Sequence, residues 1–323
     1  MTRTPTLDGL RAISILAVLS AHMLPLGPKF LHLNASAGAM GMTLFFALSG
    51  FLITSNLLAH QQIYSFFIRR LTRILPLAYL YLLVVYLTIN PAMLPGNLLF
   101  IENYVQSYMD SWNAHFWSLC VEVHFYICIG LSVAIFGNRS IWLVMPMCFA
   151  VTLLRIYHGV MIDIKTHLRG DELLAGACVA VIFHHGLLKS FRVSNMWLAA
   201  ALVFWFFASS DFTGPLQYLR PYSSAALLAA ILGLEDGFAL AILGSRPARY
   251  IAEISYALYV IHPATVHGWM NEGSTTIRYL VKRPISFFLT FVLAHVSTFQ
   301  WEHRWMSLGK SLTVRKPVVT ASS

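Results

Sequence analysis

The sequence predicts an all-α membrane protein, a bundle of about ten transmembrane helices with both termini in the cytoplasm. Of its 323 residues, 58% are hydrophobic and only 11% are charged, whereas a soluble domain carries about 25% charged residues. Apolar runs close to the length that crosses a ~30 Å hydrocarbon core recur along the whole chain. With ten spans, 14 of the 22 lysines and arginines fall on the side of the termini, and the positive-inside rule assigns that side to the cytoplasm.

Composition also limits the partners and the domain organisation. The net charge of +9 follows from the positive-inside bias, and no basic run with interleaved aromatic residues suggests nucleic acid. The four cysteines lie in apolar stretches without ligand spacing, so we expect no disulfide and no metal site. No cleavage pattern follows the first apolar run, so the first helix is expected to be retained. We expect one transmembrane domain at 1–310 and a short polar tail at 311–323. The expected spans are 9–27, 36–58, 74–95, 117–136, 141–157, 172–188, 193–209, 222–242, 253–270 and 285–302, of which 222–242 is the weakest because Glu235 and Asp236 interrupt it.

The first span carries two residues that are costly in a membrane, Arg11 and His22. Eleven residues at roughly 100° each make three turns plus about 20°, so both side chains lie on one helix face, about 16 Å apart along the axis. Ionisable groups inside a membrane are rare and usually face a cavity or a partner. Two interpretations stay open: a functional pair, or an interfacial Asp8–Arg11 anchor with His22 bonded to a neighbouring backbone group.

The second and third spans each carry a short motif. In FFALSGFLI (45–53), Ser49 and Gly50 are small residues that allow close helix packing. Ser49 as a nucleophile is the alternative, but no G-x-S-x-G turn surrounds it. In FFIRRLTRILP (66–76), Arg69, Arg70 and Arg73 are either a cytoplasmic anchor or a clamp for phosphate groups, whose geometry the guanidinium fork matches.

Further along, HFWSLCVEVHFY (115–126) places Glu122 about one turn inside an apolar span. Its expected partner is a histidine or arginine of another helix, and the topology puts it at a depth similar to that of His22. Arg169 lies in a polar loop that is expected outside, either solvated or in contact with a polar acceptor. In ISYALYVIHPA (254–264), Tyr259 and His262 share one helix stripe. Ordinary packing is the alternative for both.

Six segments in order resemble the acyltransferase-3 family of bacterial membrane O-acyltransferases. They are LDGLRAISILAVLSAH (7–22), FFALSGFLI, FFIRRLTRILP, FWSLCVEVHFY, LRGDELLAGA (168–177) and ISYALYVIHP. The resemblance covers nearly the whole chain. It implies about ten spans in the bacterial cell (inner) membrane and an acyl-CoA donor taken from the cytoplasm. It also implies acyl transfer to a hydroxyl, commonly on a lipid-linked or exported glycan. Many members carry a fused SGNH domain, and we expect none here.

The resemblance also implies roles for particular residues. It maps the family's arginine–histidine pair to Arg11 and His22, its arginine cluster to Arg69, Arg70 and Arg73, and its glutamate to Glu122. We therefore expect the four arginines to bind the phosphates of acetyl-CoA, which is a substrate and not a permanently bound cofactor. His22 is expected to be the general base or a covalent acyl carrier, with Glu122 orienting it. Arg169, Tyr259 and His262 are expected to contact the acceptor.

Alternatives to this function remain open. Among enzymes, succinyl or another acyl group could go to a Nod factor or a macrolide in place of acetyl transfer to an exopolysaccharide or a lipopolysaccharide. A proton-coupled transporter or flippase of a glycolipid is a different class, in which Arg11, His22 and Glu122 would relay protons or bind a head group. A structural partner in polysaccharide assembly machinery is the third class.

Overall fold

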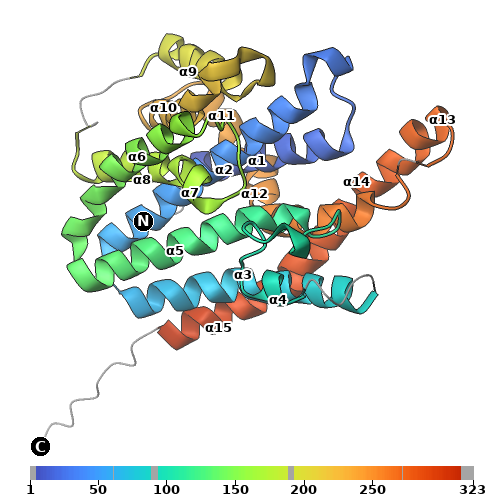
Figure 1. Cartoon of the computed structure of the whole chain (residues 1–323), viewed down its shortest axis with the longest axis horizontal. Helices are drawn as coiled ribbons and strands as arrows, with labels where there is room; N and C mark the ends of the chain where they lie inside the picture. Colours follow the sequence, from blue (N-terminus) through green and yellow to red (C-terminus); the bar gives the residue numbers. More distant parts are fainter. Residues whose placement is uncertain (1–4, 61, 89–93, 188–192, 271, 314–323) are drawn as a thin grey trace, which may run out of the picture.

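A computed structural model of the chain describes residues 5–60, 62–88, 94–187, 193–270 and 272–313, and these are mainly helical and contain no strand (Figure 1). The predicted all-α class is confirmed. Part of the expected tail, residues 314–323, lies outside the described residues. The α-helices are α1 (Pro5–Met23), α2 (Leu33–His60), α3 (Ile63–Thr88), α4 (Leu94–Leu98), α5 (Trp117–Phe136), α6 (Val144–Tyr157), α7 (Thr166–Arg169), α8 (Asp171–His184), α9 (Asn195–Ser209), α10 (Arg220–Leu232), α11 (Phe238–Leu243), α12 (Arg246–Val266), α13 (Thr275–Ile277), α14 (Arg283–Val296) and α15 (His303–Thr313).

Within the described ranges, six helical segments are long and apolar enough to cross a membrane. A further pair of helices, Asn195–Ser209 and Asp211–Leu232, is bent by 114° and makes a seventh if it is one span. The count of ten spans and the side of the termini stay predictions. The expected run 222–242 is not one helix, because α10 ends before Glu235 and Asp236 and α11 begins after them. The six segments are Pro5–Met23, Lys29–His60, Ile63–Thr88, Ala114–Phe136, Asn138–Tyr157 and Thr275–Thr313.

The centre of the bundle depends on glycines where helices cross. A Cβ added to Gly50 of α2 would lie 1.9 Å from the Leu173 carbonyl oxygen of α8. A Cβ added to Gly176 of α8 would lie 1.8 Å from the Ala47 carbonyl oxygen of α2. Small residues at such crossings allow helices to pack closely without an apolar driving force between them. The packing role predicted for Gly50 is confirmed.

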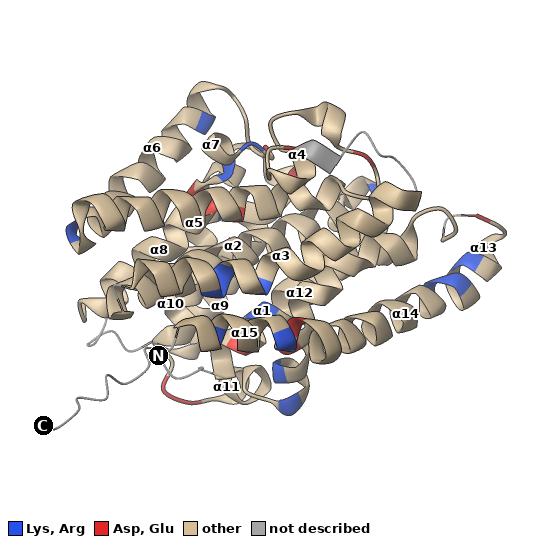
Figure 2. Ribbon diagram, turned by 90° about the horizontal axis from the view of Figure 1, so that it is seen from below, with Lys and Arg blue, Asp and Glu red and all other residues tan. Residues whose placement is uncertain are grey.

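Charged residues are sparse along the ribbons, and α13 and α14 extend away from the body of the bundle (Figure 2). Large apolar side chains on α14 are exposed, among them Phe288, Leu293 and Val296. Exposed apolar surface of this extent suits contact with lipid rather than with water. These features agree with a multi-pass membrane protein.

Helix α1 packs against α2 and α12 and has an almost fully buried stripe. Gly41 of α2 allows the closest approach, since a Cβ there would lie 2.6 Å from the Ser14 carbonyl oxygen of α1. This packing leaves the two ends of the helix beside two different cavities.

Candidate functional site

The first cavity, here called the arginine cavity, has a volume of about 650 Å³ and is lined by Arg11 of α1 and by Arg69, Arg70 and Arg73 of α3. Three carboxylates, Asp8, Glu253 and Glu302, also line it. The structure therefore brings together the four arginines that the sequence predicted as one group. Spacing explains three of the four, because Arg69, Arg70 and Arg73 lie within one and a quarter turns of one helix, whereas Arg11 is brought to them from α1.

A smaller cavity of about 310 Å³ shares the three α3 arginines and adds Lys310 of α15, with no carboxylate among its described lining residues. The side chain of Arg69 is held by a 3.0 Å hydrogen bond from Nε to the Thr313 hydroxyl. Arg70 lies over the Tyr126 ring, with its guanidinium carbon 5.6 Å from the ring centre. A positive recess of this kind, with guanidinium groups held in place, suits an anion such as phosphate.

The second cavity, here called the histidine cavity, has a volume of about 840 Å³ and lies at the other end of α1. Four histidines line it, and they come from distant parts of the chain: His22 of α1, His115 before α5, His262 of α12 and His267 just after α12. Tyr259 and Arg169 line it as well. The predicted acceptor residues Arg169, Tyr259 and His262 thus share one cavity with His22.

His22 is paired with His262. Its Nδ1 lies 2.9 Å from His262 Nε2, and the two rings have centres 5.0 Å apart and planes 6° apart, so they meet edge to edge through these two nitrogens. His262 Nδ1 lies 2.7 Å from the backbone oxygen of Tyr259. His262 is only 2% exposed, so the packing of α12 fixes the position of its ring.

Glu122 is near different groups. It interacts electrostatically with Arg11 and hydrogen-bonds Tyr126, and its side chain is 5% exposed. Of the two kinds of partner expected for Glu122, a histidine or an arginine of another helix, the arginine Arg11 lies within electrostatic range. In the described part of the chain, the hydrogen-bond partner of His22 is His262.

Arg169 is not solvated, contrary to one of the two interpretations of its loop. It is 3% exposed, its Nε lies 3.2 Å from Glu172, and its guanidinium lies over the Trp117 ring at 5.2 Å. Glu172 also pairs with Arg220 at 2.8 Å, while Arg155 pairs with Asp171 at 2.6 Å.

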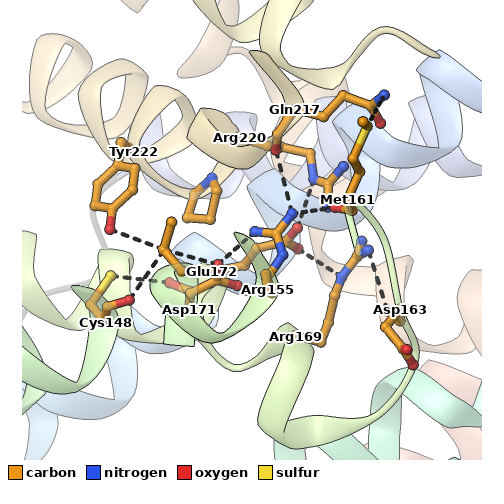
Figure 3. A network of polar contacts seen from close by, with 12 residues as sticks. Cys148, Arg155, Met161, Asp163, Arg169, Asp171, Glu172, Gln217, Arg220 and Tyr222 are labelled. Carbon is orange, nitrogen blue, oxygen red and sulfur yellow. Dashed lines mark hydrogen bonds and ion pairs between the residues drawn. The ribbon is translucent and has the colours of Figure 1, made fainter. Parts of the chain in front are cut away.

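Figure 3 shows that these residues form one network joining α6, α7, α8 and α10. Arg155 and Arg220 both donate to the backbone oxygen of Met161, and Arg169 donates to that of Asp163 at 3.5 Å. These bonds hold the loop that forms one wall of the histidine cavity. Arg169 therefore shapes the cavity as well as lining it.

One residue of the site, His115, was missed by the predictions from sequence. His115 stands at the start of the motif that contains Glu122, where a histidine beside an apolar span was a usable signal. Its Nε2 donates to the Val260 oxygen at 3.1 Å. No group of three or more His, Cys, Asp or Glu side chains in the described ranges is placed to hold a metal ion.

Comparison with known proteins places this geometry in context. The acyltransferase-3 family model, described as an acyltransferase domain, matches residues 5–299. The chain is 28% identical over 316 residues to a putative peptidoglycan O-acetyltransferase, YrhL, of Bacillus subtilis, covering 80% of this chain and 48% of that one. It is 27% identical over 319 residues to the peptidoglycan O-acetyltransferase OatA of Listeria monocytogenes, covering 80% and 48%.

A third relative is the O-acetyltransferase OatA of Staphylococcus aureus, 26% identical over 355 residues and covering 91% of this chain and 55% of that one. The chain thus spans about half the length of the curated relatives that it matches. No solved structure matches it.

Proposed function

Because this chain belongs to the acyltransferase-3 family, we propose that it is an O-acetyltransferase of the bacterial cell (inner) membrane. It would move an acetyl group from cytoplasmic acetyl-CoA to a hydroxyl of a cell-wall or surface glycan. The observation that carries the proposal is that α1 lines the arginine cavity with Arg11 and the histidine cavity with His22. A donor with phosphates at one end and a thioester at the other fits such a division.

The donor would bind through its phosphates. Arg69, Arg70 and Arg73 face both the arginine cavity and the smaller recess with Lys310, and charge-assisted bonds from guanidinium groups are the strong way to hold phosphate. The flexible arm of CoA would extend along α1, which rises about 16 Å between Arg11 and His22. Glu122, close to Arg11 and Tyr126, would hold Arg11 in this donor site.

The reaction would take place in the histidine cavity. His22 removes the proton from the acceptor hydroxyl, the alkoxide oxygen bonds to the thioester carbon, the carbon–sulfur bond breaks, and CoA leaves with the proton that His22 returns. Arg169 and Trp117, whose ring lies under the Arg169 guanidinium, would form the wall for the acceptor. The names of the relatives favour a peptidoglycan sugar over an exopolysaccharide or a lipopolysaccharide as the acceptor.

Transfer of labelled acetyl groups from acetyl-CoA in membranes tests the proposal. We expect His22→Ala to lose transfer, by 10²-fold or more, and the matched exposed variant His158→Ala to retain it. Substantial transfer by His22→Ala would exclude both the base and the covalent role of His22. Proton-coupled movement of a glycolipid without consumption of acetyl-CoA would instead identify a transporter.

The donor site has its own test. Loss of one charge-assisted bond costs about 1.5–3 kcal/mol, which is about 10- to 100-fold in affinity. We therefore expect Arg70→Ala to raise the KM for acetyl-CoA by that factor, and the exposed variant Arg304→Ala to leave it unchanged. An unchanged KM in Arg70→Ala would argue against phosphate binding at this cluster. Loss of O-acetyl signals from the NMR spectrum of cell-wall glycan in cells without the gene would identify the acceptor.

A further inference from the structure

The hydrogen bonds of the histidine pair have only one consistent arrangement of protons for two neutral rings. A backbone carbonyl can only accept, so His262 Nδ1, 2.7 Å from the Tyr259 oxygen, must carry a proton. A neutral imidazole has one N–H, so His262 Nε2 is then an acceptor. It lies 2.9 Å from His22 Nδ1, which must therefore be the protonated nitrogen of His22. The free lone pair of His22 is left on Nε2.

Pro263 explains why the Tyr259 carbonyl is available. In an α-helix the N–H of residue 263 would donate to the carbonyl of residue 259, but proline has no N–H. Helix α12 continues through Pro263 to Val266, so the Tyr259 oxygen lacks its usual helical donor. The side chain of His262 supplies one. His262 thus supplies the acceptor nitrogen for His22. Pro263 frees the Tyr259 oxygen, which fixes the proton of His262 on Nδ1.

We propose that His262 is a positioning residue that sets the tautomer of His22, so that Nε2 is the nitrogen that acts on the acceptor hydroxyl. This inference rests on the proposed function of His22. In a serine-protease triad a carboxylate holds the histidine in the correct tautomer, and here a neutral imidazole takes that place. A neutral acceptor fixes the direction of the hydrogen bond without adding a charge to a buried site.

The surroundings hold His262 firmly. The Tyr259 hydroxyl donates to the His115 backbone oxygen at 2.6 Å and lies 2.6 Å from the Ser118 hydroxyl. The His115 ring packs against the His262 ring with centres 5.5 Å apart. The other titratable or charged groups that line the cavity with the pair are His115, Asp163, Arg169, Tyr259 and His267. In the described ranges no carboxylate hydrogen-bonds either ring, so the imidazole of His262 is the group that directs His22.

Nitrogen NMR of the ¹⁵N-histidine-labelled full chain reads the tautomer directly. At a pH where both rings are neutral, the signals lost in His22→Ala identify His22. We expect its Nδ1 to be protonated and its Nε2 to be unprotonated in the wild type, and a mixture of the two tautomers in His262→Phe. The control His158→Phe should leave the His22 signals unchanged. A wild-type His22 protonated at Nε2, or an unchanged tautomer in His262→Phe, would overturn the proposal.

Kinetics separate positioning from folding. We expect His262→Phe to lower kcat about 10²- to 10⁴-fold with the KM for acetyl-CoA unchanged, since the arginine cavity is distant. His262→Gln, which retains an acceptor oxygen, should recover at least about tenfold of this loss. If His262→Phe is fully active while His22→Ala has lost activity, the role proposed for His262 is refuted and the proposed function of His22 stands. Full activity of His22→Ala would refute the proposed function, and the NMR result would be unaffected.

Discussion

The crossing of α2 and α8 gives the sharpest structural prediction. A Cβ at Gly176 would lie 1.8 Å from the Ala47 carbonyl oxygen, which is 1.6 Å short of the 3.4 Å at which ordinary contacts begin. The obstructing atom belongs to a helix backbone, so relief requires the two helices to move apart. Overpacking of this kind costs about 1–3 kcal/mol and sometimes more. We expect Gly176→Ala to be destabilised by at least that amount.

Gly38 of α2 is the matched control, since a Cβ there would meet only the Ala21 Cβ at 3.4 Å. Alanine favours a helix over glycine by about 0.5–1 kcal/mol, so Gly38→Ala should be neutral or stabilised. Thermal unfolding in detergent, followed by labelling of the cysteines, measures both. At about 2–4 °C per kcal/mol, Gly176→Ala should unfold some 2–12 °C below the wild type. Equal midpoints for the two variants would refute the reasoning from backbone contact.

Two further predictions concern buried charge. Glu172→Gln removes the carboxylate shared by Arg169 and Arg220, so we expect a loss of about 3–5 kcal/mol of stability. The control is Glu253→Gln, since the Glu253 carboxylate is partly exposed and lies 3.5 Å from His303 Nε2, and its loss should cost less than about 1 kcal/mol. Equal unfolding midpoints for the two variants would contradict this prediction. Burial raises the pKa of Glu102, in the loop before α5, to about 9. The folded protein therefore favours the neutral form of this carboxyl. Stability is lost as the pH rises from the pKa of Glu102 in the unfolded chain towards 9. The unfolding midpoint of Glu102→Gln minus that of the wild type should therefore be larger at pH 8 than at pH 5. An equal difference at both pH values would show that this carboxyl does not titrate with unfolding.

How much the sequence could predict depended on whether a feature is local. Arg69, Arg70 and Arg73 lie within one helix, so helical geometry alone placed them together. The run 7–22 likewise predicted that Arg11 and His22 share a face. The pairing of His22 with His262 could not be read in this way, because it joins positions 240 apart in sequence and depends on how α1 packs against α12.

The same reason explains the loop around Arg169. Taken locally, its charged residues suggested a solvated segment. The carboxylate that neutralises Arg169 is close in sequence, but Arg220, which completes the burial, comes from α10. A polar composition predicts exposure only where the fold does not bury the charged side chains in a network with partners of opposite charge, and here Arg220 of another helix completes that network through Glu172. Glu122 is a different case, because its apolar surroundings predicted a histidine or arginine of another helix as its partner and left the choice between them open; Arg11 is an arginine within electrostatic range of it.

The separation of the two cavities along α1 has a kinetic consequence. On the proposed assignment, donor and acceptor reach the reacting centre from opposite ends of the helix and do not compete for one opening. Both can therefore be bound at once, and either can arrive first. Free CoA would then inhibit competitively against acetyl-CoA and non-competitively against the glycan. An enzyme of this kind can hold acetyl-CoA before the acceptor binds. When the acceptor is scarce, the rate of transfer would then follow the concentration of the glycan.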